Sequence, residues 1–184
     1  MKRIFLVVVL LLSASAAFAG TTQKWTAGWN IFSEPLNYKT SHITWSVNPT
    51  TSKLSVSFTL VGATPNKIYQ VGVHFFCTTF PAIFGQFPTN EIVDGNCTSW
   101  TEQGVTKTVA YVALGVVTTD IHGNGSFAVV VGPIASGTYD IEFDSLDGAG
   151  CFLAGGANGA FPECEVAFQS PGPTFGDATT ITIP

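Results

Sequence analysis

The sequence predicts an all-β fold, an antiparallel β-sandwich of the immunoglobulin-like or a related type with about eight strands. Three observations lead to it. Apolar residues alternate with polar ones over short runs, turn residues separate these runs, and no window has sustained helical spacing with caps. Short strands joined in this way are typical of antiparallel sandwiches.

The first 19 residues predict a secretory signal peptide. Lys2 and Arg3 give a positive start, residues 4–12 are apolar throughout, and Ala17-Phe18-Ala19 matches the pattern cut by signal peptidase. The apolar run is shorter than the roughly 20 residues that span a bilayer, and no later stretch is apolar enough to do so as a helix. We therefore expect a single domain from residue 20 to residue 184. It would be secreted, or located in the periplasm or cell envelope, with no transmembrane segment.

Period-two alternation places the strands. In Leu54 to Leu60 every second residue is apolar and the residues between carry hydroxyls, which indicates a strand with one wet face. Residues 43–47 repeat this pattern, and the turn residues from Asn48 to Lys53 predict a hairpin between the two. Further strands are expected at 69–75, 106–118, 126–131, 138–146, 165–168 and 178–183.

The charge of the expected mature chain excludes several partners. It has 5 Lys and no Arg against 12 acidic residues, a formal net charge of −7. Nucleic acid binding needs a basic surface, so nucleic acid is not an expected partner. Without Arg the chain also lacks the usual bidentate clamp for phosphate groups.

Four cysteines lie in the exported part of the chain: Cys77, Cys97, Cys151 and Cys164. An even number in an oxidising compartment predicts two disulfides. Three pairings exist, and we favour Cys77–Cys97 with Cys151–Cys164 because each pair brackets one Gly/Pro-rich loop. A metal site would need C-x-x-C spacing, which is absent.

An acidic stripe is the most specific candidate for a site. Asp140, Glu142 and Asp144 alternate with apolar residues and so share one face of a strand. Calcium takes carboxylate oxygens in flexible geometry, so the stripe is a candidate calcium site. The favoured interpretation is a solvated outer strand face, as antiparallel sheets usually have.

Other catalytic patterns are missing. The segment from Asp120 to Ser126 imitates part of a calcium loop but lacks its acidic twelfth residue, so we interpret it as a hairpin turn. The three histidines, His42, His74 and His122, show no metal-ligand spacing, and there is no G-x-S-x-G nucleophile elbow. No catalytic residues are predicted.

Aromatic residues gather in the two cysteine-bracketed loops and at the mature N-terminus. The loops contain Phe80, Phe84, Phe87, Phe152 and Phe161, which either form a second small core over one end of the sandwich or an exposed patch for a partner. The N-terminal group could stack on sugars or cover a sheet face; it consists of Trp25, Trp29, Phe32, Tyr38 and Trp45.

These features favour an exported, non-enzymatic protein with a structural, adhesive or envelope-associated role. Its partners would be another protein, a second copy of the chain or a glycan. The first alternative is a secreted module that binds carbohydrate or calcium. The second is a metal-dependent enzyme without a recognisable motif.

Overall fold

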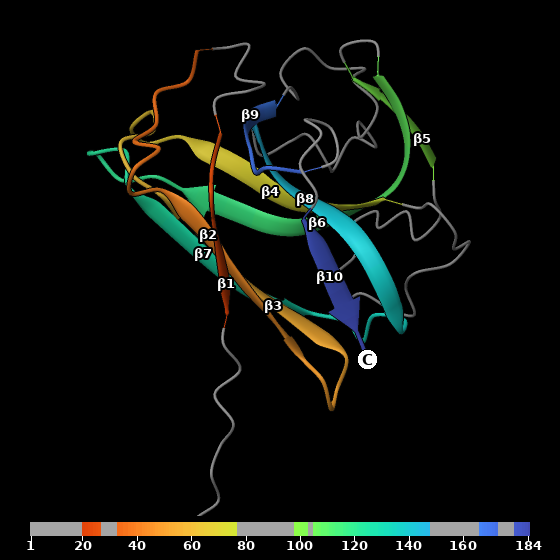
Figure 1. Cartoon of the computed structure of the whole chain (residues 1–184). Coiled ribbons are helices and arrows are strands. Elements are labelled where there is room, and N and C mark those ends of the chain that lie inside the picture. The colour runs from red at the N-terminus through yellow and green to blue at the C-terminus, as the bar shows by residue number, and fades with distance from the viewer. Residues whose placement is uncertain (1–19, 27–32, 77–97, 103–104, 148–165, 173–178) are drawn as a thin grey trace, which may run out of the picture.

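The computed structural model describes residues 20–26, 33–76, 98–102, 105–147, 166–172 and 179–184. In these residues the chain forms ten β-strands and no helix, and every strand pairing is antiparallel (Figure 1). The all-β class with two antiparallel sheets is thereby confirmed. The immunoglobulin-like subtype stays a prediction.

The strands divide into a four-stranded and a six-stranded sheet. The four-stranded sheet has the order β1-β2-β3-β7 and consists of β1 (Thr21–Lys24), β2 (His42–Asn48), β3 (Lys53–Leu60) and β7 (Gly125–Val131). The six-stranded sheet has the order β10-β8-β4-β6-β5, with β9 also paired to β8. Its strands are β4 (Ile68–Phe76), β5 (Thr98–Glu102), β6 (Val105–Thr118), β8 (Gly137–Asp147), β9 (Val166–Gln169) and β10 (Thr180–Ile183).

All eight predicted strands are present, with ends shifted by one or two residues. The predicted hairpin is β2 and β3, which pair from His42↔Thr59 to Asn48↔Lys53. The side chain of Asn48 stabilises the turn, because its Oδ1 accepts hydrogen bonds from the N–H groups of Thr50 and Thr51 at 2.9 and 3.1 Å. The sequence missed β1 and β5, whose short polar segments have no alternation of apolar residues.

The segment from Asp120 to Asn124 is not the predicted hairpin turn. It joins β6 of the six-stranded sheet to β7 of the four-stranded sheet, so it is a corner between the sheets. Asp120 Oδ1 accepts hydrogen bonds from the N–H groups of His122 and Asn124, and these bonds lower the pKa of the Asp120 carboxyl. An Asx-type turn of this kind can close a hairpin within one sheet or turn a corner between two sheets. The turn residues alone therefore do not distinguish the two.

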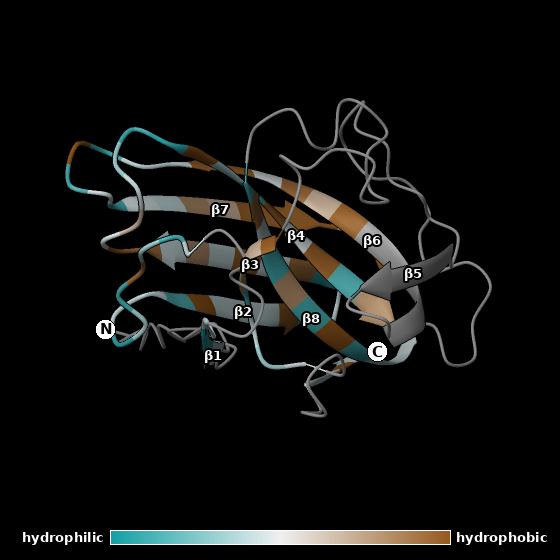
Figure 2. Cartoon of the chain, turned by 90° about the horizontal axis from the view of Figure 1, so that it is seen from above, coloured by the Kyte–Doolittle hydropathy of each residue, from teal (hydrophilic) through white to brown (hydrophobic). Residues whose placement is uncertain are grey.

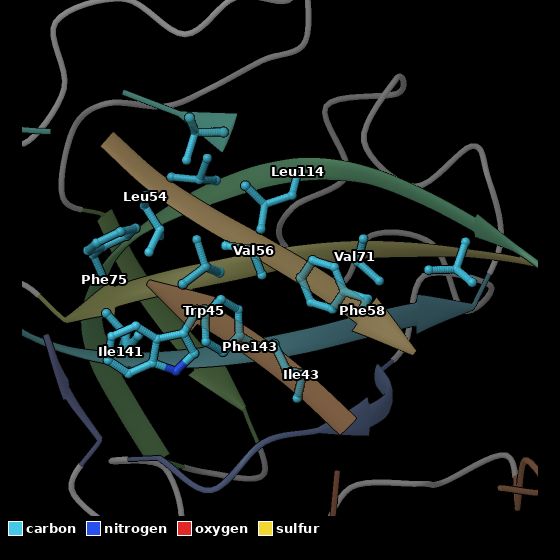
Figure 3. Close-up of a cluster of buried hydrophobic side chains, with 14 of the residues drawn as sticks. Ile43, Trp45, Leu54, Val56, Phe58, Val71, Phe75, Leu114, Ile141 and Phe143 are labelled. Carbon is cyan, nitrogen blue, oxygen red and sulfur yellow. The ribbon is translucent and has the colours of Figure 1, made fainter. Parts of the chain in front are cut away.

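One hydrophobic core lies between the two sheets. Figure 3 shows side chains of both sheets in it. Phe58 of β3 meets Phe143 of β8 edge to face at a centroid distance of 5.8 Å. The inward positions of β3 are fully or almost fully buried while its outward hydroxyls are half-exposed, as the alternation predicted. Every residue of β4 after Ile68 is buried, because β4 is a central strand of the larger sheet.

The two sheets are joined by different contacts at the β1 edge and at the β7 edge of the four-stranded sheet. Beside β1, the chain crosses from one sheet to the other: Thr26 forms a β-bridge with Gln169, and Gln23 Nε2 donates to Thr179 Oγ1 at 2.6 Å. Beside β7, the ring of Phe127 packs directly on Gly115 of β6, where a Cβ atom would overlap the ring. Gly115 has φ 150° and follows a β-bulge in the pairing of β4 with β6.

Several predictions concern residues outside the described ranges. The four cysteines Cys77, Cys97, Cys151 and Cys164 are among them, and so are Phe80, Phe84, Phe87, Phe152 and Phe161 and the proposed signal peptide. Their disulfides, partner patch and cleavage stay predictions. Within the described ranges there is no helix of the length and apolarity needed to cross a membrane.

Candidate functional site

The predicted acidic stripe lies on the outer face of β8, the face turned away from the core. Tyr139, Ile141 and Phe143 point into the core, so the alternate residues Asp140, Glu142 and Asp144 share the opposite face, as predicted. The expectation that this face is solvated is wrong for two of them, because Glu142 and Asp144 are both 0% exposed. Asp140 is half-buried, and its Oδ1 accepts a hydrogen bond from Thr180 Oγ1 at 3.0 Å.

The neighbouring strand β4 brings a histidine to the same face. His74 is paired with Glu142, and Gly72 with Asp144, so the imidazole lies among the carboxylates. His74 is 2% exposed and its Nε2 lies 3.6 Å from Asp144 Oδ2. Burial lowers the pKa of His74 to about 3, so the ring is neutral at neutral pH.

Strand β9 and the residues after it complete this cluster. Gln169 Nε2 donates a hydrogen bond to Glu142 Oε1, and Gln169 is itself 0% exposed. The segment is held in register by Ser170, whose N–H donates to Phe143 O and whose Oγ accepts from Phe143 N–H. Two residues later Gly172 lies against Glu142 so closely that a Cβ there would overlap its side chain. We call His74, Glu142, Asp144 and Gln169 the buried polar cluster.

The buried polar cluster joins groups that could exchange protons or hold a cation. A buried carboxylate is costly unless it is paired, hydrogen-bonded or neutral, so two of them in one place require partners. Asp140 accepts a hydrogen bond from Thr180, Glu142 accepts one from Gln169, and Asp144 Oδ2 lies 3.6 Å from His74 Nε2. In the described ranges no set of three or more His, Cys, Asp or Glu side chains is arranged to hold a metal ion. The calcium site at Asp140, Glu142 and Asp144 stays a prediction.

The sequence did not predict His74 and Gln169 as neighbours of the stripe. His74 has no metal-ligand spacing with the other histidines, and Gln169 belongs to no motif. The available signal was the alternation in β4 itself, where Gln70 and His74 occupy the positions opposite the core residues Val71 and Val73. Strand pairing brings His74 opposite Glu142, and pairing is what a single sequence does not show.

The outer face of the four-stranded sheet is a second candidate and has the opposite character. It is lined by hydroxyl side chains from all four strands, which we call the hydroxyl face: Thr22, Thr44, Ser46, Ser55, Ser57, Thr59 and Ser126. These residues are half-exposed or exposed, and strand pairing arranges them in rows such as Thr22–Thr44–Ser57, which ends at Ala128 of β7. Figure 2 shows β2, β3 and β7 side by side in this layer.

A shallow groove of about 380 Å³ runs over the hydroxyl face between β2, β3 and β7. Its polar lining comes from Thr44, Ser46, Ser55 and Ser57, and its apolar lining includes Val130, which is 54% exposed. The four strands of this sheet contain no Asp or Glu, although the chain has 12 acidic residues. The sheet therefore presents a carboxylate-free surface on a net-acidic protein.

The aromatic residues near the expected mature N-terminus belong to the core where the structure describes them. Trp25 is 2% exposed and stacks on Phe58, and Trp45 is 9% exposed on the inner face of β2. Tyr38 is half-buried and meets Phe168 edge to face. These three rings are not available as a flat platform for sugars, which corrects the alternative interpretation for them. Trp29 and Phe32 lie outside the described residues.

Comparisons with known proteins add little. No protein-family model matches the chain, and no curated protein matches it. One solved structure with some similarity is described as "pH-induced modulation of Streptococcus parasanguinis adhesion by Fap1 fimbriae". It is 16% identical, the match covers 70% of this chain and 68% of that chain, and the TM-score is 0.31. At this TM-score the two folds are not shown to be alike.

Proposed function

We propose that this chain is an exported, non-enzymatic structural or adhesive β-sandwich protein that makes its contacts through the open side of the four-stranded sheet. The observation that supports this is the hydroxyl face, with its groove of about 380 Å³ and its exposed Val130. Exposed apolar groups within a polar surround are typical of protein contact surfaces, and hydroxyls supply adaptable hydrogen bonds. The absence of Asp and Glu from these strands removes the charge that would otherwise oppose contact with acidic envelope or cell surfaces.

The test places a negative charge in the groove. Microspheres coated with the purified chain are measured for binding to a glycan array, to immobilised envelope proteins and to microspheres coated with the same chain. We expect binding to at least one of these, and we expect Thr44→Glu and Ser57→Glu to reduce it at least about tenfold because a desolvated carboxylate is unfavourable in a contact.

The matched control is His122→Glu, which adds the same charge at an exposed position in the corner between the sheets. It should bind as the unmodified chain does. Binding to none of the three surfaces, or full binding by Thr44→Glu, would contradict the proposal.

A cation-binding role is the second candidate, supported by the burial of Glu142 and Asp144 on one strand face. A divalent cation would offset the repulsion between these carboxylates. Calorimetric titration with calcium, compared between the unmodified chain and Glu142→Gln, tests it. Heat of binding that disappears in Glu142→Gln supports the site, and no heat with the unmodified chain rejects it.

A further inference from the structure

Strand β7 forms one edge of the four-stranded sheet. In the described part of the chain β3 pairs with one side of β7 over all seven residues without a register shift, and no strand pairs with its other side. An antiparallel edge strand directs the N–H and C=O groups of alternate residues outward, where they can pair with another strand. Native edges are usually protected by Lys, Pro, a bulge or very short length. The sequence of β7, GSFAVVV, has none of these.

The residues of β7 suit pairing with an identical strand of a second copy. Strand β7 carries no charge, its outward residues Ser126 and Ala128 are exposed, and Val130 is 54% exposed. On the inner side Phe127 and Val129 are only partly buried against the core. The carboxylate-free four-stranded sheet also means that the net negative charge of two copies is not concentrated where their edges would meet.

The symmetry of such a pair can be derived. When two β7 strands pair antiparallel in one continuous sheet, opposed residues lie on the same face. The two-fold axis therefore lies between one residue and the same residue of the second copy, which oppose each other. The middle residue of Gly125–Val131 is Ala128. With the axis there, Ala128 opposes Ala128 of the second copy, Phe127 opposes Val129, and Ser126 opposes Val130. The half-buried pair Phe127 and Val129 then covers its counterpart on the core side.

We propose that β7 is a self-association strand: two copies of this chain pair edge to edge, antiparallel about Ala128, and join their four-stranded sheets into one sheet of eight strands with a continuous hydroxyl face. This inference rests on the proposed contact surface and names its partner as a second copy. Seven residue pairs make a smaller contact than the standard interface of about 800 Å² per partner, so the association is weak and grows with local concentration.

The self-opposition of Ala128 allows a sharp test by charge exchange. The unmodified chain, Ala128→Asp, Ala128→Lys and an equimolar mixture of the two variants are measured by light scattering after size exclusion, from about 10 µM to about 1 mM. We expect a dimer fraction that rises with concentration in the unmodified chain. Each single variant should stay monomeric because like charges face each other across the axis, and the mixture should regain the dimer because opposite charges then meet.

The matched control is Thr182→Lys, which adds the same charge at an exposed position of β10 in the six-stranded sheet, and it should dimerise as the unmodified chain does. Circular dichroism and the melting temperature of each variant establish that it is folded. A monomeric unmodified chain at about 1 mM, a charged single variant that dimerises normally, or a mixture that stays monomeric would each overturn the pairing.

This experiment separates the two proposals. If the unmodified chain is monomeric but still binds a glycan or envelope protein through the groove, only the self-association is wrong. If the dimer forms as described but microspheres bind neither glycans, envelope proteins nor one another, the adhesive function is wrong and the pairing stands.

Discussion

The two sheets of this protein share a core but differ on their outer faces. The outer face of the four-stranded sheet is a row pattern of half-exposed Ser and Thr, whereas the outer face of the six-stranded sheet holds His74, Glu142, Asp144 and Gln169 at 2% exposure or less. The sequence pattern on β3 and on β8 is the same alternation of apolar and polar residues. Polarity at every second position therefore identified strands correctly without indicating whether the polar face is wet.

The difference between the sheets should vanish on their inner faces. Phe58 and Phe143 are both 0% exposed and contact each other across the core, so Phe58→Ala and Phe143→Ala should each lower the free energy of unfolding by about 3–5 kcal/mol. Urea unfolding followed by tryptophan fluorescence measures this. A loss in one variant less than half that in the other would show that the sheets do not share the core equally.

On the outer faces, a glutamate introduced into each sheet should separate the two. Gln70→Glu adds a carboxylate at a position that is 2% exposed on β4, and we expect it to cost about 3 kcal/mol because a buried charge loses its hydration. Thr44 on β2 is half-exposed, so Thr44→Glu should lower the free energy of unfolding by less than about 1 kcal/mol. Equal losses in urea unfolding would remove the distinction between a buried and a wet outer face.

The contact between the sheets beside β7 can be tested through Gly115. A Cβ on Gly115 would overlap the Phe127 ring, and its φ of 150° disfavours other residues, so Gly115→Ala should cost about 1–3 kcal/mol. Adding Phe127→Leu to this variant should recover part of the loss by shortening the opposing side chain. If the double variant loses the full sum of both single effects, the two residues do not act on each other.

The smallest effect concerns pH. Because the pKa of His74 falls from about 6.5 in the unfolded chain to about 3 in the folded one, only the unfolded state binds a proton between these values. This contribution to stability is complete above pH 6.5 and declines as the pH falls, by about 1.4 kcal/mol per unit.

Urea unfolding at pH 6 and pH 5 measures this slope. His74→Gln should have a slope smaller by about 1.4 kcal/mol per unit than the unmodified chain. Identical slopes in His74→Gln and the unmodified chain would show that His74 does not contribute to the loss of stability at acidic pH.

The strands could be predicted because the alternation of apolar and polar residues is a local property of the sequence. Which strands pair with each other is not a local property. The turn at Asp120 has the same residues whether it closes a hairpin or turns a corner between sheets, so the assignment of β6 and β7 to different sheets was beyond local reasoning. The acidic stripe was found on one face as predicted, yet its burial depends on strand pairing with His74 and on the approach of Gln169 and Gly172 from a distant segment. The alternating hydroxyl residues of β2 and β3 predicted the hydroxyl face. Strand β1 was missed because its four residues are all polar.

The path of the N-terminal strand has a mechanical consequence. Four residue pairs join β1 to β2 in one sheet, and two residues later Thr26 bridges Gln169 in the other. A pull along β1 from its N-terminal end loads these contacts together in shear, and they must fail as a group before the strand slides. A pull across β1 would open them one at a time. For a protein held by an attachment near residue 20, the direction of tension would then decide how much force the sandwich withstands.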